Sequence, residues 1–347
     1  MRAAFFRRHG GPEVMEVGEL PDPTPGPGEV LVQVRAAGMN HIDLWLRRGL
    51  PALKVPFPHV AGGDACGVVA GVGAGVRGVA EGDRVVVNPG ISCGRCLRCL
   101  SGEDNLCAQY ELVGEQRWGA EAERLVVPAV NVAPAPAGAS DEELAALPIV
   151  YLTVWQMLVD RARVQPGEVV LVLAAGSGVG VAAIQIARLQ GARVIAAASS
   201  EKKLAKAREL GAEETVLYRR ESAGDDLGAA LKKLVGRRGV DVVVEHTGTP
   251  TFAAVVKACA KGARIVTCGA TGGHEVALDL RYVFWRQIAV LGSTMAPKGR
   301  LLMLLQMVAA RRLVPVIDSV IPLEEIAEGH RRLEAGEVVG KLVVRVS

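Results

Sequence analysis

The second half of the chain alternates short apolar runs with helical patterns, and this alternation restricts the possible folds more than any other feature. Helical patterns at 181–190 and 201–210 are each closed by a glycine. Strands joined by helices pair in parallel, because each helix returns the chain to the same edge of the sheet. We therefore expect a doubly wound parallel sheet. Its strands are predicted at 169–174, 193–198, 214–217, 241–245, 264–268 and 288–292.

The turn after the first of these runs consists of small residues and leads directly into a helix. Small residues let the backbone approach a pyrophosphate, and a helix N-terminus supplies free N–H groups. The glycines depart from the strict G-x-G-x-x-G spacing. Tight packing of the turn without a ligand is the alternative. The residues that we expect to bind a dinucleotide are Gly176, Ser177, Gly178, Val179 and Gly180.

The end of the second run indicates which dinucleotide is bound. A fold that binds NAD carries Asp or Glu there, to accept from the ribose hydroxyls. Ala198 occupies this position. The donors that follow it are Ser199, Ser200 and Lys203, which suit a 2′-phosphate. We expect NADP(H); the alternative is that Lys202 and Lys203 are solvated and Glu201 serves as the acid.

Four of the seven cysteines crowd into one short segment. Their spacing is C-x₂-C-x₂-C-x₇-C, and Gly94 and Gly102 allow the backbone to wrap around one ion. An odd, clustered count indicates metal rather than disulfides, and four thiolates form a closed tetrahedral zinc site. An iron–sulfur cluster or an unmetallated loop remain alternatives. We expect one structural Zn²⁺ on Cys93, Cys96, Cys99 and Cys107.

The rest of the chain predicts a second domain made of two separate segments. The first ~135 residues form short alternating runs bounded by glycine and proline, typical of an irregular, mostly β domain. After residue 293 two helices and two strands follow, too few to fold alone. We expect a first domain at 1–150 with the cysteine lobe at 90–110, a dinucleotide domain at 151–293, and a return segment at 294–347 that completes the first.

Composition excludes several classes of protein. Half of the residues are hydrophobic and 22% are charged, which argues against disorder. The net charge of +3 is spread along the chain, so nucleic acid is not an expected partner. There is no apolar run long enough for a membrane span and no signal-peptide pattern at the start. We expect a cytoplasmic protein that acts on a small molecule.

Taken in order, the motifs resemble the medium-chain dehydrogenase/reductase superfamily, which includes zinc alcohol dehydrogenases and quinone oxidoreductases. The resemblance covers essentially the whole chain. It implies a GroES-like, mostly β catalytic domain, a Rossmann domain and a nicotinamide-dependent enzyme. Besides the cysteine lobe, the motifs are Asn40-His-Ile-Asp43, Gly82-Asp-Arg-Val85, Leu152-Thr-Val-Trp155 and Gly340-Lys341.

The resemblance also implies roles for single residues. The catalytic candidates are Asn40, His41, Asp43 and Thr153. The further cofactor-binding candidates are His246, Gly269 and Lys341. For His246, a purely structural role is the alternative.

The resemblance breaks at the catalytic metal. Zinc alcohol dehydrogenases use two cysteines and a histidine, and the matching positions here are Asn40, Gly63 and Ile149. A substitute site could be built from His41, Asp43, His59 and Asp64. Without a Lewis acid, the enzyme should favour substrates already activated to accept hydride.

These observations lead to three hypotheses about function. The first is NADP(H)-dependent hydride transfer to quinones or α,β-unsaturated carbonyl compounds. The second is an alcohol or aldehyde dehydrogenase with an atypical metal site. The third is an NADP(H)-binding sensor or structural protein without turnover. In each case we expect a homodimer or homotetramer, because 288–294 is an apolar strand at the end of the sheet.

Overall fold

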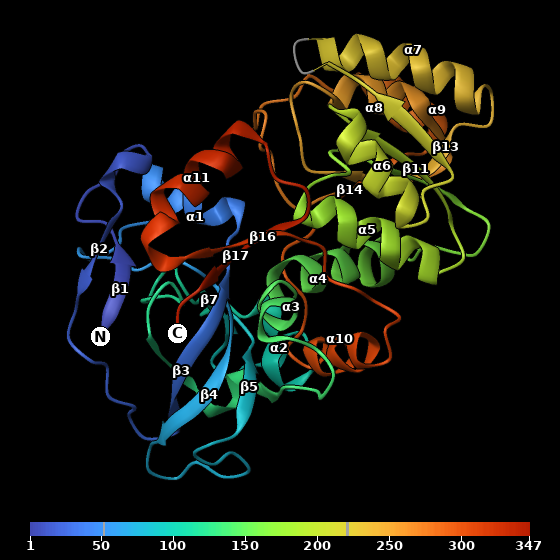
Figure 1. Cartoon of the computed structure of the whole chain (residues 1–347). Helices are drawn as coiled ribbons and strands as arrows, with labels where there is room; N and C mark the ends of the chain where they lie inside the picture. The colour runs from blue at the N-terminus through green and yellow to red at the C-terminus, as the bar shows by residue number, and fades with distance from the viewer. Residues whose placement is uncertain (51–52, 220–221) are drawn as a thin grey trace. The chain divides into compact units, whose positions relative to one another are not determined.

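Figure 1 shows the computed structural model of the chain, which describes residues 1–50, 53–219 and 222–347. The chain forms two compact units. The first consists of Met1–Leu152 and Ala296–Ser347, and the second is Thr153–Met295. The end of the chain therefore returns to the unit in which the chain began.

The first unit is organised around a seven-stranded sheet. Its order is β16 (Ile317–Pro322), β17 (Lys341–Arg345), β3 (Glu29–Gly38), β4 (Asp64–Val72), β5 (Arg84–Val87) and β9 (Val132–Pro134), with β8 (Arg124–Pro128) also paired to β3. The return segment adds β17 antiparallel to β3, with Val343 opposite Gly38. In Figure 1 the red strands β16 and β17 accordingly lie beside the blue β3. The GroES-like, mostly β domain expected from the motifs is confirmed.

Alternation along β3 explains the core of this unit. Val30, Val32 and Val34 are fully buried, because every second side chain of a strand points to the same face. Helices α1 (His41–Arg48) and α11 (Ile326–Ala335) pack on each other within the unit. The remaining elements of the unit are β1 (Arg2–Phe5), η1 (Pro12–Val14), β2 (Glu16–Glu19), β6 (Gly90–Ile91), α2 (Leu97–Leu100), η2 (Asp104–Leu106), β7 (Glu111–Leu112), η3 (Ala129–Asn131), α3 (Asp141–Ala145), α10 (Arg300–Ala309) and η6 (Leu323–Glu325).

The second unit contains a six-stranded sheet in which every pair is parallel. Its order is β12 (Glu214–Leu217), β11 (Arg193–Ala198), β10 (Val169–Val172), β13 (Val240–Glu245), β14 (Cys259–Thr267) and β15 (Ala289–Gly292). The strand order reverses between β10 and β13, and such a reversal opens a crevice at the carboxyl ends of the strands where ligands bind. The expected doubly wound parallel sheet is confirmed.

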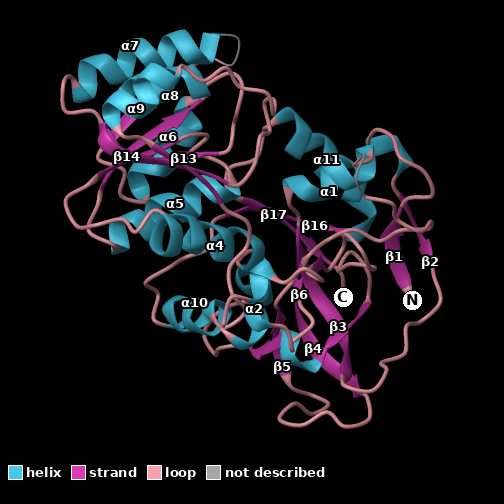
Figure 2. Cartoon of the chain, turned by 180° about the vertical axis from the view of Figure 1, so that it is seen from behind, coloured by secondary structure: helices cyan, strands magenta, loops and turns pink. Residues whose placement is uncertain are grey.

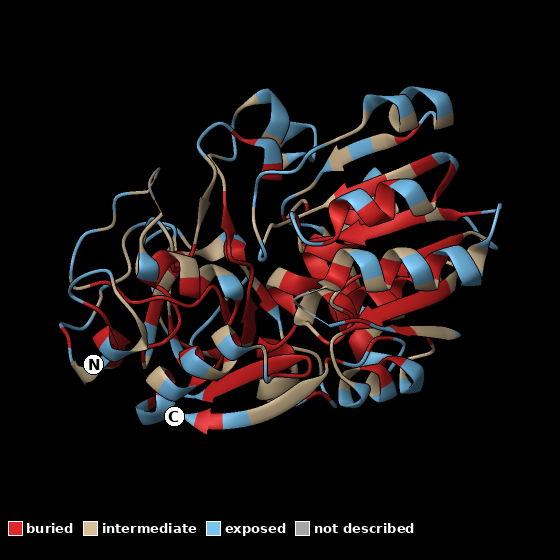
Figure 3. Ribbon diagram, turned by 90° about the horizontal axis from the view of Figure 1, so that it is seen from above, coloured by how far each residue is buried: buried red, intermediate tan, exposed pale blue. Residues whose placement is uncertain are grey.

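Helices cover both faces of this sheet (Figure 2). They are α5 (Gly178–Leu189), α6 (Glu201–Glu209), α7 (Ala223–Val235), α8 (Phe252–Ala258) and α9 (Leu280–Arg286), preceded by α4 (Pro148–Trp155) and the π-helical turn η4 (Gln156–Arg161). Leu227 of α7 and Val255 of α8 share one buried cluster with Val243 of β13. Buried residues fill the central strands β10, β11 and β13, whereas the edge strand β15 and the outer sides of the helices are partly exposed (Figure 3). In the described part of the chain, no helix has the length and apolar character needed to cross a membrane.

Candidate functional site

The small-residue turn after β10 forms a tight loop that opens α5. Ser177 is the residue before the helix, and its Oγ accepts a hydrogen bond from the N–H of Gly180 at 3.0 Å. A Cβ at Gly180 would lie 2.5 Å from the carbonyl oxygen of Ala174, so the loop can close only around glycine. The arrangement leaves the first N–H groups of α5 facing the carboxyl end of the sheet, which favours an anionic ligand.

The end of β11 borders this loop. Ala198 is the last residue of the strand, and Ser200 caps α6 by accepting from the N–H of Lys203 at 3.4 Å. The stem of Lys203 runs over Gly176, where a Cβ would lie 2.5 Å from Lys203 Cγ. Glu201 points to a different partner, since its Oε2 lies 3.5 Å from Nη1 of Arg208. The structure thus brings the predicted phosphate-binding residues together at one edge.

The loops after β13 and β14 complete this edge. His246 Nε2 lies 3.1 Å from Ser177 Oγ, which joins β13 to the small-residue loop. Glu245 is buried beside it, and it accepts hydrogen bonds from the N–H groups of Thr247 and Gly248. Burial raises the pKa of Glu245 above its usual range. Gly269, on the loop after β14, is half-buried, and its carbonyl accepts from the Thr267 hydroxyl at 3.0 Å.

In the first unit, Asn40 lies at the centre of a buried polar network. Its Oδ1 accepts from Lys341 Nζ at 2.6 Å, and its Nδ2 donates to Asp64 Oδ2 at 2.9 Å. Lys341 Nζ also pairs with Asp64 Oδ2 at 3.1 Å. The other oxygen of Asp64 accepts from the N–H of Ile149 at 2.8 Å. Both polar atoms of the Asn40 amide and both oxygens of Asp64 are therefore already bonded within the protein.

Asp43 holds the start of α1 in place beside this network. Its two oxygens accept from the N–H groups of Asn40, at 2.6 Å, and of Gly62, at 3.3 Å. Burial raises the pKa of Asp43 to about 7, although the bond from Asn40 acts in the opposite direction. Asp43 can therefore exchange a proton near neutral pH, unlike an ordinary surface aspartate.

The three positions matched to catalytic-zinc ligands do not form a metal site. A Cβ at Gly63 would lie 2.7 Å from Ile149 Cδ1, so the isoleucine fills the space beside the glycine. The substitute ligands do not assemble either: His59 is fully buried, with Nε2 placed 3.0 Å from the Gly114 carbonyl. Across the residues that the structure describes, the cysteine lobe is the one group of at least three possible ligands within reach of a common ion.

The two remaining catalytic candidates lie on helices. His41 is the first residue of α1 and is exposed. Thr153 is buried in α4, and its hydroxyl lies 3.8 Å from the sulfur of Met295.

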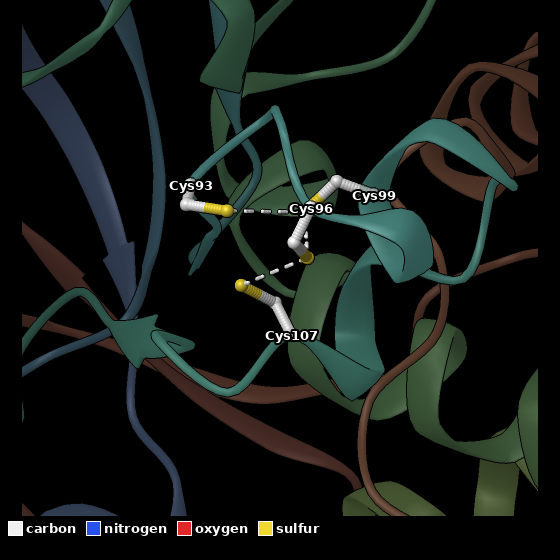
Figure 4. A group of neighbouring side chains, drawn as sticks. All are labelled: Cys93, Cys96, Cys99 and Cys107. Atoms are coloured by element: carbon white, nitrogen blue, oxygen red, sulfur yellow. Dashed lines mark hydrogen bonds between the residues drawn. The ribbon is translucent and has the colours of Figure 1, made fainter.

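The cysteine lobe brings four thiols to one point (Figure 4). All four sulfurs lie within 4.8 Å of one another, with Cys96 Sγ 3.5 Å from Cys99 Sγ and 3.9 Å from Cys107 Sγ. A zinc ion bound about 2.3 Å from each sulfur places the sulfurs about 3.8 Å apart, so the thiols fit a tetrahedral ion. The N–H groups of Arg95 and Cys96 hold the pKa of Cys93 at about 6, which favours the thiolate form that binds metal.

Sequence reasoning missed three features of these sites. Glu245, Glu121 and His330 are buried ionisable residues that no motif identified. For Glu245 a signal existed, because an acidic residue directly ends an apolar strand. Lys341 was expected at the cofactor, and the structure gives it contacts with Asn40 and Asp64.

Comparisons with known proteins agree with this organisation. Residues 26–137 match the model of the alcohol dehydrogenase GroES-like domain, and residues 178–310 match that of zinc-binding dehydrogenases. The chain is 31% identical over 346 residues to an acryloyl-coenzyme A reductase of Metallosphaera sedula, which covers 99% of each chain. The chain is a medium-chain dehydrogenase/reductase. It is therefore an oxidoreductase of the nicotinamide-dependent kind.

Solved structures of other medium-chain dehydrogenase/reductases share its fold. One, described as an NAD-dependent alcohol dehydrogenase, is 54% identical, has a TM-score of 0.95 and matches over 100% of both chains. Another, a 2-octenoyl-coenzyme A carboxylase reductase in complex with NADP and 2-octenoyl-coenzyme A, is 29% identical with a TM-score of 0.91. That match covers 99% of this chain and 87% of the other.

Proposed function

We propose that the protein is an NADP(H)-dependent reductase of α,β-unsaturated carbonyl compounds, with coenzyme A thioesters as the preferred class. The observation that carries the proposal is the closed network of Asn40, Asp64 and Lys341. Because its polar atoms already bond to each other, it offers no ligand to a catalytic metal. Without a metal to polarise an alcohol or carbonyl oxygen, a substrate whose own conjugation activates it for hydride is favoured.

A double bond conjugated to a thioester carbonyl has this activation. Hydride adds to its β-carbon, and the carbonyl takes up the negative charge without an external Lewis acid. The names of two relatives support this class, since one is an acryloyl-coenzyme A reductase and another was solved with 2-octenoyl-coenzyme A. Quinones remain a second kind of acceptor with the same property.

The roles of individual residues belong to the same proposal. The phosphates and adenosine end of the cofactor would bind at Gly176, Ser177, Gly178, Val179, Gly180, Ser199, Ser200 and Lys203, with His246 and Gly269 beside them. Asn40, His41, Asp43 and Thr153 would act at the reacting atoms. Lys341 would contribute a buried positive charge through Asn40.

Three features support NADP(H) over NAD(H). β11 ends in Ala198 rather than an acid, Lys203 runs along the loop, and Glu201 is paired with Arg208. A relative was also solved with NADP. The 54% identical structure is described as NAD-dependent, which favours the opposite choice. Titration with NADPH and NADH decides between them, and tighter NADH binding would refute our assignment.

We further propose one structural zinc on Cys93, Cys96, Cys99 and Cys107. Four thiolates leave no open position on the ion, so it would stabilise the lobe without touching the substrate. Elemental analysis should find about one zinc per chain, and a second stoichiometric zinc would refute the metal-free active site.

A homo-oligomer is supported by the edge of the six-stranded sheet. β15 is its terminal strand, and Val290 on it is 45% exposed. The neighbouring α9 exposes Phe284 and Trp285 by 67% and 73%. A two-fold contact that pairs β15 with its copy would cover these apolar groups. Light scattering at micromolar concentration tests this.

The central experiment follows NADPH oxidation with crotonyl-coenzyme A, a quinone and a simple enone. It also follows NAD(P)⁺ reduction with ethanol and benzyl alcohol. We expect reduction of the thioester, and a mild chelator that spares the closed zinc site should not change its rate. Strong alcohol oxidation that is lost on chelation would instead support an atypical-metal alcohol dehydrogenase, which the name of the 54% identical structure favours. Cofactor binding without turnover of any compound would support a sensor.

A further inference from the structure

The first unit buries a second group of ionisable side chains, which have no role in the reduction as proposed above. Glu121 precedes β8, Arg47 belongs to α1, and His330 belongs to α11. Their exposed fractions are 1%, 0% and 0%. Helices α1 and α11 contact each other and are adjacent in both Figure 1 and Figure 2. Three ionisable side chains are thus held away from solvent at one place.

Most polar atoms of this group have no hydrogen-bond partner in the described structure. These atoms are both carboxyl oxygens of Glu121, both ring nitrogens of His330 and Nη1 of Arg47. His330 Nε2 lies 4.0 Å from Glu121 Oε1, which is too far for a direct hydrogen bond. Arg47 Nε donates to the Gly10 carbonyl at 3.2 Å, and Nη2 pairs with Glu334. Buried polar atoms are rarely left unsatisfied, so a group of five such atoms at one place calls for a specific explanation.

Gly62 connects this group to Asp43. The N–H of Gly62 donates to Asp43 Oδ1 at 3.3 Å. On its other side, a Cβ at Gly62 would lie 3.0 Å from Glu121 Cγ. The two carboxyl-bearing side chains therefore flank one glycine, and the charge of Asp43 acts on Glu121.

The charges of the group follow from burial. Burial raises the pKa of Glu121 well above its usual range, and the charge of Asp43 raises it further, against the opposing effect of Arg47. Burial and the charge of Arg47 lower the pKa of His330 to about 3. At neutral pH His330 is therefore neutral, and burial favours the protonated form of Glu121. Arg47 and His330 face the carboxyl group of Glu121, and Lys341 and Asp64 face that of Asp43. Glu334 pairs with Arg47.

We propose that Glu121 and Asp43 form one coupled carboxyl pair that keeps a proton available to the active site at neutral and mildly alkaline pH. This inference rests on the proposed reductase function. In the reaction, hydride from NADPH forms the β C–H bond, and the π electrons move to the carbonyl oxygen as an enolate. A proton from the pair then forms the α C–H bond. NADPH becomes NADP⁺, and the pair regains its proton from water.

Glu121 is a positioning residue in this scheme, because it acts through Asp43. Two like charges this close in a buried site do not both form readily, so the pair loses its protons in two separated steps. The first step belongs mainly to Asp43, whose pKa burial raises to about 7, and the second belongs mainly to Glu121, whose pKa burial raises well above its usual range. The native pair should therefore keep a proton to higher pH than Asp43 would alone.

The variant Glu121→Gln tests the coupled carboxyl pair through the pH dependence of kcat, which a merely structural role of Glu121 would not change. Without the second carboxyl group, Asp43 alone must supply the proton, and it is lost above about pH 7. We expect kcat of Glu121→Gln to fall about tenfold per pH unit above that point, while kcat of the native enzyme begins to fall only at higher pH. Glu123→Gln, two residues away and half-buried, should keep the native profile. Parallel profiles for native enzyme and Glu121→Gln would overturn the inference.

Infrared spectroscopy of the resting protein provides a test without turnover. The native protein and Glu123→Gln should show the C=O band of a protonated carboxyl group at pH 8, and Glu121→Gln should lack it. If Glu121→Gln does not fold, Glu121→Met, of similar length, replaces it in both measurements. Absence of a Glu121-dependent band overturns the pair whatever the activity. If the band is present but the protein reduces none of the acceptors, the proposed reductase function is refuted instead. The pair would then exist without delivering its proton to a substrate.

Discussion

Replacing His330 with phenylalanine should make the protein more resistant to unfolding by acid. His330 is fully buried, and its ring nitrogens have no hydrogen-bond partner among the described residues. Burial lowers its pKa to about 3 from the ordinary value of 6.5. Between these two values the unfolded chain binds a proton that the folded chain does not. The neutral His330 therefore contributes stability that is fully present above pH 6.5. The native protein loses this stability as the pH falls below 6.5, and the loss is complete near pH 3.

The magnitude follows from the width of this pH window. Each pH unit corresponds to about 1.4 kcal/mol. Acidification from pH 6.5 to 4.5 should therefore remove about 2.7 kcal/mol of the free energy of unfolding through His330 alone. Phenylalanine keeps a ring of similar shape and does not titrate.

Urea unfolding at pH 7.5 and pH 4.5 measures the effect. On going from pH 7.5 to pH 4.5, the native protein should lose about 2.7 kcal/mol more of its free energy of unfolding than His330→Phe does. His274→Phe, at an exposed position, should change little. If His330 were instead a charged partner of Glu121, His330→Phe would lower the free energy of unfolding most at the pH at which both groups are charged. An unchanged or inverted difference between the two pH values would therefore refute the reasoning.

Three further predictions concern the metal, the cofactor and the assembly. Cys96→Ser should lower the zinc content from about one per chain toward none, and the melting temperature by on the order of 5 °C. Turnover of the folded fraction should persist. Intact stability with abolished turnover would contradict a structural zinc. Ala198→Asp should repel a 2′-phosphate and shift the ratio of NADPH to NADH affinity by on the order of 100-fold, as measured by fluorescence titration. Val290→Lys should convert the oligomer to smaller species in light scattering, whereas the same substitution at the exposed Val130 should not.

Much of the second unit could be predicted from local patterns. Strands β11 and β12 occupy 193–198 and 214–217, as their apolar runs predicted. The apolar spacing is enough here, because strands buried on both faces are continuous hydrophobic runs bounded by polar turns. Helix α5 begins at Gly178, three residues before the periodic pattern, because Ser177 caps it and the glycines continue the turn into the helix.

In the candidate site, too, the features that could be predicted are those formed by residues close together in the sequence. The four thiols come from one short segment, so their spacing in the sequence already indicated that they could meet. Asn40 was identified by its motif, but the motif could not show that its amide bonds to Lys341, 301 residues further along the chain. That contact exists because the return segment adds β17 to the edge of β3.

The sequence by itself therefore determined the two kinds of domain, the dinucleotide loop and the cysteine lobe. Each depends on side-chain periodicity or on residues close together in the chain, and such features need no knowledge of distant contacts. Only the tertiary structure decided that Glu121, His330 and Asp43 are buried together, and that Ile149 fills the space beside Gly63. The charge state of a carboxyl or imidazole group depends on whether distant segments exclude water from it, and no local pattern records which segments will do so.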